Sequence, residues 1–305
     1  MQTFSHLSGV YAAVVTPVKD DFSLDSRALP ALLEFIIERG CHGALLLGTT
    51  GEGPSFAPSE RLALMRSALQ VRSTHPGFRL LAGTGTPSLT ETIELTGAAF
   101  ELGYDGVVVL PPYYFRKASD EGLYLWFSQV IQQAVPAGKA LLGYHIPQVS
   151  GVSFSFDLLS RLKSNFPNQF AGIKDSSGDL DHARLLGETF KQDLLVLNGN
   201  DRLFSQALQS GAGGCITACA NLCSADLRQV WDGHQHSEDT SNYQSRLISF
   251  RSVAERYQPF PPLMKALLAR QYGFPCWTVR PPLLPLAGEL VDQAVADLHS
   301  LWNNV

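Results

Sequence analysis

Residues 170–179 read FAGIKDSSGD, and the interpretation of the fold starts from this stretch. Its first four residues form a short apolar run, which is typical of a buried strand. The Asp, Ser and Gly residues that follow favour a loop leading into a helix cap. Lys174 therefore stands where a buried strand opens into a loop, which in an α/β barrel is the face that carries the active site.

A lysine at that position suits one chemistry in particular. Apolar surroundings destabilise the charged ammonium form, and the neutral amine attacks a ketone to form a Schiff base. For Lys174 taken alone, the competing interpretation is a side chain that merely extends its amine into solvent at the strand end. The rest of the sequence has to decide between the two.

The same alternation of short apolar runs and longer amphipathic runs continues along the chain, and it predicts eight strands with helices between them. The predicted strands are 9–16, 43–47, 79–83, 106–110, 140–144, 170–174, 194–197 and 214–217. The predicted helices are 25–39, 59–74, 88–102, 119–134, 156–165, 180–190 and 202–210, with Asp25 and Ser59 as the caps of the first two. Eight such units indicate a closed (β/α)8 TIM barrel, with a doubly wound open sheet as the alternative.

Strand signals stop after about residue 224, and helices are predicted at 237–257, 262–272 and 286–302. We therefore expect a barrel catalytic domain over residues 1–225 and a C-terminal helical extension over 226–305. The extension is too short for a second enzyme domain, so we expect it to pack on the barrel or to build an oligomer contact.

The composition is that of a soluble globular protein: 305 residues, 45% hydrophobic and 17% charged, with a net charge of -5. This mild acidity provides no basic surface for nucleic acid or for an anionic membrane. No apolar run approaches the roughly 20 residues that span a bilayer. The five cysteines are irregularly spaced and we identify no signal peptide, so we expect a reducing, cytoplasmic setting.

Residues 48–52, Gly-Thr-Thr-Gly-Glu, follow the second predicted strand. The glycines allow unusual backbone angles and close approach of a ligand. The hydroxyls of Thr49 and Thr50, with backbone amides, suit a carboxylate or phosphate. A plain glycine turn is the alternative, and the Gly-Lys-Ser/Thr element of a Walker loop is missing. Residues 198–201 and 211–216, beside the last two predicted strands, also offer backbone that a ligand can approach closely. The alternative is that they simply connect neighbouring elements.

Tyr144 ends the fifth predicted strand, and a phenol at the mouth of a barrel can transfer protons. A tyrosine buried in the core is the alternative interpretation. His145 follows it, and the alternation of side chains along a strand turns this residue either toward a substrate or into the wall. At the end of the fourth strand, one of Tyr113 and Tyr114 is expected to face the barrel mouth while the other packs.

Cys215, Cys219 and Cys223 recur at every fourth residue, which is not the spacing of a zinc ribbon or finger. We expect small buried side chains there. His234 and His236 lie in a polar stretch and are expected to be solvated.

Taken together, these motifs resemble the dihydrodipicolinate synthase / N-acetylneuraminate lyase family of class I aldolases. The resemblance rests on the order and spacing of five motifs, at residues 15–17, 48–52, 113–114, 144–147 and 172–175. It implies a (β/α) barrel with C-terminal helices, usually assembled as a tetramer, here a homotetramer built as a dimer of dimers.

The resemblance also implies a set of roles. Lys174 forms an imine with the ketone of pyruvate or another 2-oxo acid, and Tyr144 transfers protons. Thr49 and Tyr114 complete a hydroxyl relay, with Tyr114 contributed across a subunit contact in some relatives. Thr50 holds the carboxylate of the 2-oxo acid. The other implied substrate-binding positions are Gly48, Gly199, Ile216 and His145. The implied partners are pyruvate and an aldehyde, with no metal and no organic cofactor.

Two positions depart from the family pattern. The usual Tyr-Asn-x-Pro is Tyr-His-Ile-Pro at residues 144–147. Two residues after that proline, dihydrodipicolinate synthases typically carry an arginine that binds the carboxylate of the aldehyde substrate, and here the residue is Val149. An aliphatic side chain cannot form a bidentate ion pair, and the loss costs about 2–4 kcal/mol of transition-state binding. We therefore predict that the chain is not an efficient dihydrodipicolinate synthase.

The sequence favours a Schiff-base aldolase or lyase. Two enzyme alternatives share the scaffold: 4-hydroxy-tetrahydrodipicolinate synthase proper, and a 2-oxo-3-deoxy sugar acid dehydratase in which the imine drives the loss of water. The non-enzyme alternative is a barrel that binds a 2-oxo acid, but the joint presence of Lys174, Tyr144 and Thr49 argues against it. Substrate choice is expected to involve His145, Gln148, Phe115 and Ser176.

Overall fold

The computed structural model describes residues 4–190 and 193–302. Eight parallel strands pair in chain order as a closed barrel, which confirms the predicted (β/α)8 TIM barrel and shows that the doubly wound alternative is wrong. The strands are β1 (Gly9–Ala13), β2 (Gly43–Leu46), β3 (Arg79–Gly83), β4 (Gly106–Val109), β5 (Ala140–His145), β6 (Phe170–Asp175), β7 (Leu195–Asn198) and β8 (Gly214–Thr217).

Helices alternate with these strands and continue after the last of them. They are α1 (Leu29–Glu38), α2 (Pro58–Ala68), α3 (Leu89–Glu101), α4 (Asp120–Ala134), α5 (Pro147–Ser150), α6 (Phe156–Asn165), α7 (Leu180–Phe190), α8 (Phe204–Gln209), α9 (Ala220–His236), α10 (Ser241–Ala254), α11 (Phe260–Tyr272) and α12 (Gly288–Trp302). None of the helices described here combines the length and the apolar character needed to cross a bilayer.

The predicted strands agree with the structure to within one residue at each end, except for the first. Most strands are buried along their whole length, as expected when both faces of a parallel sheet are covered, so they stand out as apolar runs. The first strand was predicted to reach residue 16 but ends at Ala13. Residues 14–16 are still buried there, so the apolar run outlasts the strand.

Two of the predicted helix starts are confirmed by their caps. The hydroxyls of Ser88 and Ser119 accept backbone N–H bonds in the first turns of α3 and α4. The caps predicted at Asp25 and Ser59 are wrong. Helix α2 begins one residue earlier, at Pro58, where the missing N–H of proline costs nothing because the first helical N–H has no partner within the helix.

The prediction also missed α9, which follows β8 almost directly. Thr217 Oγ1 accepts the N–H of Ala220 at its start. Small residues make up much of the buried face of α9, so the apolar repeat that identifies a helix is weak. The helix expected at 237–257 is α10, followed by a short 3-10 turn, with residues 237–240 linking it to α9.

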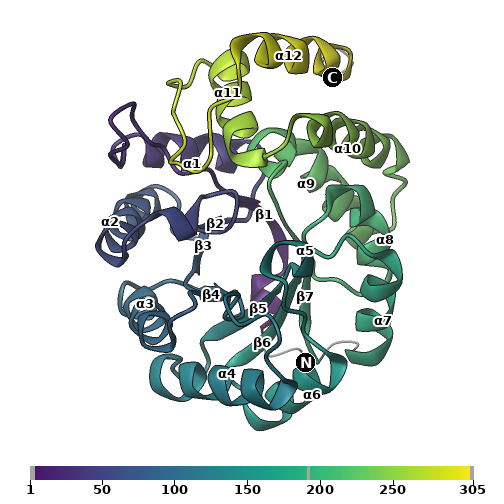
Figure 1. Cartoon of the computed structure of the whole chain (residues 1–305). Helices are drawn as coiled ribbons and strands as arrows, with labels where there is room; N and C mark the ends of the chain where they lie inside the picture. The colour runs from purple at the N-terminus through teal and green to yellow at the C-terminus, as the bar shows by residue number, and fades with distance from the viewer. Residues whose placement is uncertain (1–3, 191–192, 303–305) are drawn as a thin grey trace. The chain divides into compact units, whose positions relative to one another are not determined.

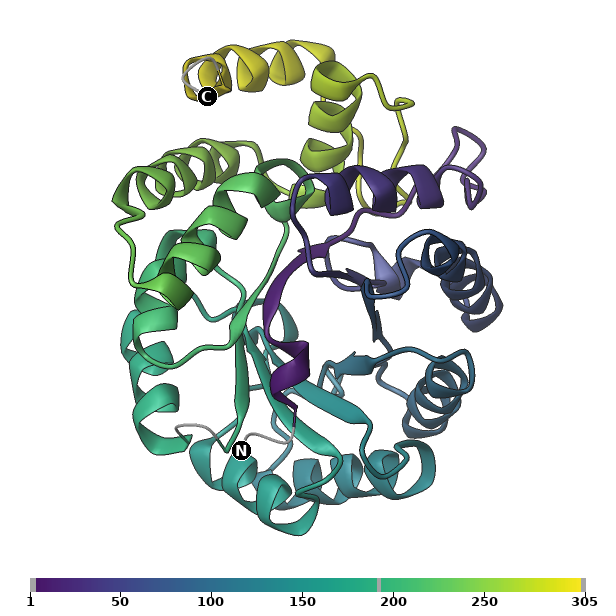
Figure 2. The ribbon, with the colours of Figure 1, turned by 180° about the vertical axis from the view of Figure 1, so that it is seen from behind.

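The chain divides into two compact units. The first, Met1–Gly9 with Arg79–Ile216, contains β3 to β7 and most of β8, with α3, α4, α6, α7 and α8 on the outside of the strands (Figure 1). The second, Val10–Phe78 with Thr217–Val305, contains most of β1, all of β2 and the helices α1, α2 and α9 to α12. Within it α10 packs against α9 and α12, as the view in Figure 2 shows.

Candidate active site

Lys174 and Tyr144 lie side by side at the carboxyl ends of β6 and β5. The two residues are paired in the parallel register, so their side chains point to the same side of the strands. The Lys174 Nζ lies 3.9 Å from the centre of the Tyr144 ring. Their exposed fractions are 3% and 6%. The structure therefore brings an amine and a phenol ring together in a setting with little exposure to solvent.

The next residue on each strand points the opposite way. His145 and Asp175 are also register partners, but on the other side of β5 and β6. The Asp175 Oδ2 lies 3.2 Å from His182 Nδ1, on α7. The His145 ring stacks on the His182 ring with centres 4.6 Å apart, and its Nδ1 accepts the N–H of Phe154 at 3.1 Å. The His145 ring therefore lies on the side of β5 opposite to Tyr144. The substrate contact expected of His145 stays a prediction.

The three titratable groups of this cluster influence one another. Burial lowers the pKa of His145 to about 4, so its ring is neutral at pH 7. The hydrogen bond with Asp175 raises the pKa of His182. Burial alone would raise the pKa of Asp175, but the hydrogen bonds from His182 and Ser177 outweigh it and lower that pKa. The result is a polar pair of Asp175 and His182 beside a neutral imidazole.

These three side chains each offer one ligand atom, and the three atoms lie within 4.8 Å of one another. Imidazole and carboxylate groups are suitable ligands for divalent transition metals. The two rings, however, are stacked with only 11° between their planes, so their in-plane lone pairs run side by side instead of converging. The Nδ1 atoms of His145 and His182 already take part in hydrogen bonds. The cluster therefore fits a hydrogen-bonded support behind the strand ends better than a metal centre.

Backbone and side-chain bonds connect the ends of β5, β6 and β7. The N–H of Ser176 donates to His145 O at 2.8 Å, and that of Gly199 donates to Asp175 O at 2.7 Å. Gln148 Nε2 donates to Ser176 O at 2.6 Å. Glycine at position 199 allows this close approach, because a Cβ there would lie 2.0 Å from the Ser176 hydroxyl oxygen and 2.8 Å from the Ser176 Cβ, so Ser176 would have to move. The strand ends around Lys174 are therefore held by a continuous set of hydrogen bonds.

In the second unit, residues 48–53 form a tight loop after β2. The sequence suggested unusual backbone angles at the glycines, but the left-handed residues are Leu47, with φ of 60°, and Glu52, with φ of 55°. The glycines instead permit close approach of the backbone, since a Cβ on Gly51 would lie 2.8 Å from Val14 O. The loop is thus compact and strained at two residues that are not glycine.

The two threonines of this loop differ in exposure. Thr49 is exposed, whereas Thr50 is buried, with 7% of its surface accessible. The N–H of Gly53 donates to Gly48 O at 3.1 Å and closes the loop. The backbone around both hydroxyls is therefore fixed before any ligand binds.

The tyrosines after β4 also differ from each other. Tyr113 is half-buried, whereas Tyr114 is 76% exposed. The Tyr114 ring packs edge-on against Phe115, which is 69% exposed, with ring centres 5.3 Å apart. The loop after β4 therefore presents two large aromatic side chains to solvent.

In β8, Ile216 is fully buried.

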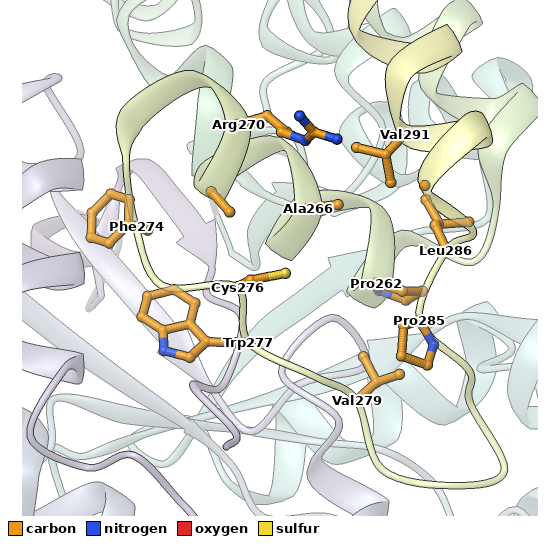
Figure 3. Close-up of a pocket in the computed structure, with 12 residues that line it drawn as sticks. Pro262, Ala266, Arg270, Phe274, Cys276, Trp277, Val279, Pro285, Leu286 and Val291 are labelled. Carbon is orange, nitrogen blue, oxygen red and sulfur yellow. The ribbon is translucent and has the colours of Figure 1, made fainter. Parts of the chain in front are cut away.

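A cavity of about 410 Å³ lies in the second unit between α11, α12 and the segment that joins them (Figure 3). Its walls are mainly apolar, and the thiol of Cys276 points toward the middle of the lining residues. Arg270 lies at its edge, where its guanidinium is 2.7 Å from Asp292. None of the site residues predicted from the sequence lines this cavity.

Sequence reasoning missed the polar partners of two residues that stand in the quoted motifs, Asp175 and Glu52. One is His182, seven positions after Asp175 and within the first turn of α7. The other is Lys265 on α11, which binds Glu52 across a separation of 213 residues.

Of the three cysteines in the four-residue repeat, Cys215 and Cys219 are buried and Cys223 is half-buried. The two histidines at the end of α9 are exposed, as expected.

Comparison with known proteins gives consistent results. The model of a family described as the dihydrodipicolinate synthetase family matches residues 6–301. A protein of Chloroflexus aurantiacus, named an uncharacterized DapA-like lyase, is 38% identical over 285 residues, which cover 93% of each chain. The 4-hydroxy-tetrahydrodipicolinate synthase of Bacillus subtilis is 29% identical over 286 residues, covering 92% of this chain and 94% of that protein.

Among solved structures, YagE of E. coli K12 superposes with a TM-score of 0.90 at 27% sequence identity. The alignment covers 97% of this chain and 98% of that one. YagE is described as a prophage protein of the dihydrodipicolinic acid synthase family, and its structure was determined in complex with pyruvate.

Proposed function

The chain belongs to the dihydrodipicolinate synthetase family and is an enzyme of the lyase class, and from this premise we propose that it is a class I aldolase acting through a Schiff base on Lys174. Its substrate would be pyruvate or a related 2-oxo acid. The observation that carries the proposal is the buried Lys174 amine, 3.9 Å from the centre of the Tyr144 ring at the carboxyl ends of β5 and β6. The pyruvate complex of YagE, a related protein, supports the choice of substrate.

In the proposed reaction, the neutral amine of Lys174 attacks C2 of a 4-hydroxy-2-oxo acid, and the carbinolamine loses water to give an imine. As the C3–C4 bond breaks, the C4 hydroxyl gives its proton to the phenolate oxygen of Tyr144, C4 leaves as the carbonyl carbon of an aldehyde, and the bonding electrons form an enamine. C3 of the enamine then takes that proton from the Tyr144 hydroxyl, and water adds to the resulting imine and releases pyruvate and the free Lys174 amine. Tyr144 also moves the proton to and from the carbinolamine oxygen.

We propose roles for the other predicted residues as well. We assign a hydroxyl relay to Thr49 and Tyr114, and the binding of the 2-oxo acid carboxylate to Thr50 and its backbone amide. The remaining positions assigned to the pocket are Gly48, Gly199 and Ile216. The exposed pair of Tyr114 and Phe115 supports a contact between subunits that brings Tyr114 to a neighbouring site, because large exposed aromatic side chains are typical of protein interfaces. We propose on this basis that subunits associate, as a homotetramer like that implied by the family resemblance, and we propose a cytoplasmic location from the irregular spacing of the cysteines.

The second substrate follows from Val149. This residue lies in α5 and is 55% exposed, so an uncharged aliphatic side chain occupies the position where an arginine is expected in a synthase. We therefore propose an aldehyde other than aspartate semialdehyde. Turnover of pyruvate with aspartate semialdehyde at the rate of a true synthase would contradict this assignment.

The experiment that tests the proposed function is reductive trapping. The protein is incubated with pyruvate, reduced with borohydride, and examined by intact mass and peptide mapping. We expect a pyruvate-sized adduct on Lys174 that is absent in Lys174→Ala. Lys163→Ala is the matched control. Lys163 is a half-buried lysine of the same unit, burial lowers its own pKa, and its loss should leave the adduct unchanged.

Each of the other outcomes of this experiment has a definite meaning. An adduct with a longer 2-oxo acid but not with pyruvate would favour the dehydratase. The absence of an adduct with any 2-oxo acid would contradict both enzyme proposals and favour a binding protein.

A further inference from the structure

Lys265 and Glu52 form an ion pair inside the second unit. Their exposed fractions are 1% and 3%, and Lys265 Nζ bonds directly to Glu52 Oε1. Lys265 also donates to Thr278 O at 2.6 Å, and Glu52 Oε2 accepts the N–H of Arg280 at 3.0 Å. Burial lowers the pKa of Lys265, while the contact with Glu52 opposes that shift. Both carboxylate oxygens of Glu52 therefore have donors, supplied by α11 and by the segment that follows it.

Glu52 is also one of the two strained residues of the loop after β2. Its φ of 55° lies in the left-handed region, which a residue with a side chain adopts only when the surroundings impose it. The two donors on its carboxylate provide that constraint from one side. On the other side, Thr16 Oγ1 donates to Gly51 O at 2.6 Å. The conformation of residues 48–52 thus depends on a partner from the C-terminal helices.

The same C-terminal segment holds the chain that follows the loop. The Arg280 guanidinium donates to both carboxylate oxygens of Glu60, at 2.8 and 2.6 Å, and to Ser55 O at 3.0 Å. It also lies 4.5 Å from the centre of the Phe56 ring. Residues 278–280 therefore contact the loop, the turn after it and the start of α2.

We propose that Lys265 is a positioning residue for the 2-oxo acid carboxylate. Through Glu52 it holds residues 48–52 in the geometry in which Thr50 and its backbone amide bind that carboxylate, although Lys265 itself does not touch the substrate. This inference rests on the proposed function and extends it, because it assigns part of the affinity for the 2-oxo acid to α11. Removing the ammonium takes away the charge that is bonded directly to the buried Glu52 carboxylate and leaves Oε1 without this donor, which favours rearrangement of the loop.

The test measures adduct formation on Lys174 against pyruvate concentration. In Lys265→Met we expect the half-saturating pyruvate concentration to rise by about 10–100-fold, the effect of misplacing a binding group by about 1 Å. The amount of adduct at saturating pyruvate should stay close to that of the unmodified protein, because Lys174 and Tyr144 are not altered. Glu52→Gln keeps the shape of the side chain and removes its charge, so it should shift the concentration dependence in the same direction.

Leu268→Ala is the matched control for loss of stability. Leu268 is fully buried on the same helix and forms no part of the ion pair, so its truncation weakens α11 without removing the counter-charge. We expect this variant to keep the pyruvate dependence of the unmodified protein. An equal shift in Leu268→Ala and Lys265→Met would overturn the proposal, since the effect would then be general destabilisation.

The proposal and its premise fail in different ways. If the unmodified protein forms no adduct at any pyruvate concentration, both are overturned. If it forms the adduct, and Lys265→Met and Glu52→Gln show the same half-saturating concentration as the unmodified protein, only the positioning role is overturned. Should Lys265→Met fail to fold, as judged by its thermal unfolding, Glu52→Gln alone decides.

Discussion

The amine of Lys174 and the ring of Tyr144 occupy paired positions on neighbouring strands, with 3.9 Å between the Nζ and the centre of the ring. This relationship is set by the backbone register of β5 and β6 and does not depend on a flexible loop. Strands hold functional side chains more rigidly than loops do. The ring should therefore keep its place when its hydroxyl is removed, so the contribution of the hydroxyl can be measured by itself.

Tyr144→Phe should lower kcat by about 10²–10⁴-fold, the usual contribution of a general acid–base group. The amine is untouched, so the Schiff-base adduct should still form, but more slowly. Steady-state turnover and the time course of borohydride trapping measure the two effects. An unchanged kcat would show that Tyr144 does not transfer protons in the slow step.

Val149→Arg should increase kcat/KM for aldehydes that carry a carboxylate by about 10–100-fold, because a guanidinium forms a bidentate pair with that group. Neutral aldehydes should gain nothing. Val149→Gln is the control, since it adds length and polarity without charge. Equal gains for charged and neutral aldehydes would contradict the assignment of position 149 to the second substrate.

His145→Asn should make the protein more resistant to acid. The pKa of His145 is about 4 in the folded state against 6.5 ordinarily, so between these values the unfolded chain binds a proton that the folded chain excludes. Stability is therefore lost as the pH falls from about 6.5 to about 4, by about 3 kcal/mol in total. An asparagine oxygen can accept the Phe154 N–H without titrating, so the variant should lose less stability over this interval.

Urea denaturation at pH 7 and at pH 4 measures this difference. The Asp175–His182 pair is present in both proteins and serves as an internal reference. The raised pKa of His182 acts in the opposite direction, because its contribution is complete at low pH and is lost as the pH rises through the folded value. Equal losses in the two proteins would show that His145 does not carry the acid sensitivity.

Lys265→Met should lower the free energy of unfolding by about 3–5 kcal/mol, because it leaves Glu52 as an uncompensated buried charge. The double variant Glu52→Gln/Lys265→Met should lose less, since neither charge is then present. Chemical denaturation of the two single variants and the double variant measures the coupling. Additive losses would indicate that the pair contributes no interaction energy.

Cys276 should be the first cysteine to react with a maleimide in the native protein. It is exposed, whereas Cys223 is half-buried and the other three are buried. Burial also raises the pKa of Cys41 to about 12, which leaves almost no reactive thiolate. Peptide mapping after brief labelling identifies the modified thiol, and Cys276→Ser should remove the fast phase. Early modification of Cys41 would contradict the burial described here.

The barrel was predictable because its strands are buried on both faces and so appear as apolar runs, each followed by a loop. The position of Lys174 followed from the same pattern, since it comes last in such a run. Helix α9 was missed because much of its buried face is made of small residues, which give no apolar repeat. Local patterns identified most of the elements but not every helix start, as the wrong caps at Asp25 and Ser59 show.

The polar partners of the site were not predictable from local patterns. His182 reaches Asp175 from the first turn of α7, and this contact depends on how the loop after β6 folds. Lys265 reaches Glu52 from α11, 213 residues away, and no spacing in the sequence connects them. Such pairs are set by packing between distant segments, which a single sequence does not display.

The buried pair of Glu52 and Lys265 also limits how this chain can be recombined with its relatives. A chimera that keeps residues 1–225 and takes its C-terminal helices from a protein without a lysine at the matching position would enclose a carboxylate with no counter-charge. Replacing Glu52 alone, with the native helices retained, would leave the ammonium in the same situation. Glu52 and Lys265 must therefore be exchanged together, although 213 residues separate them in the sequence.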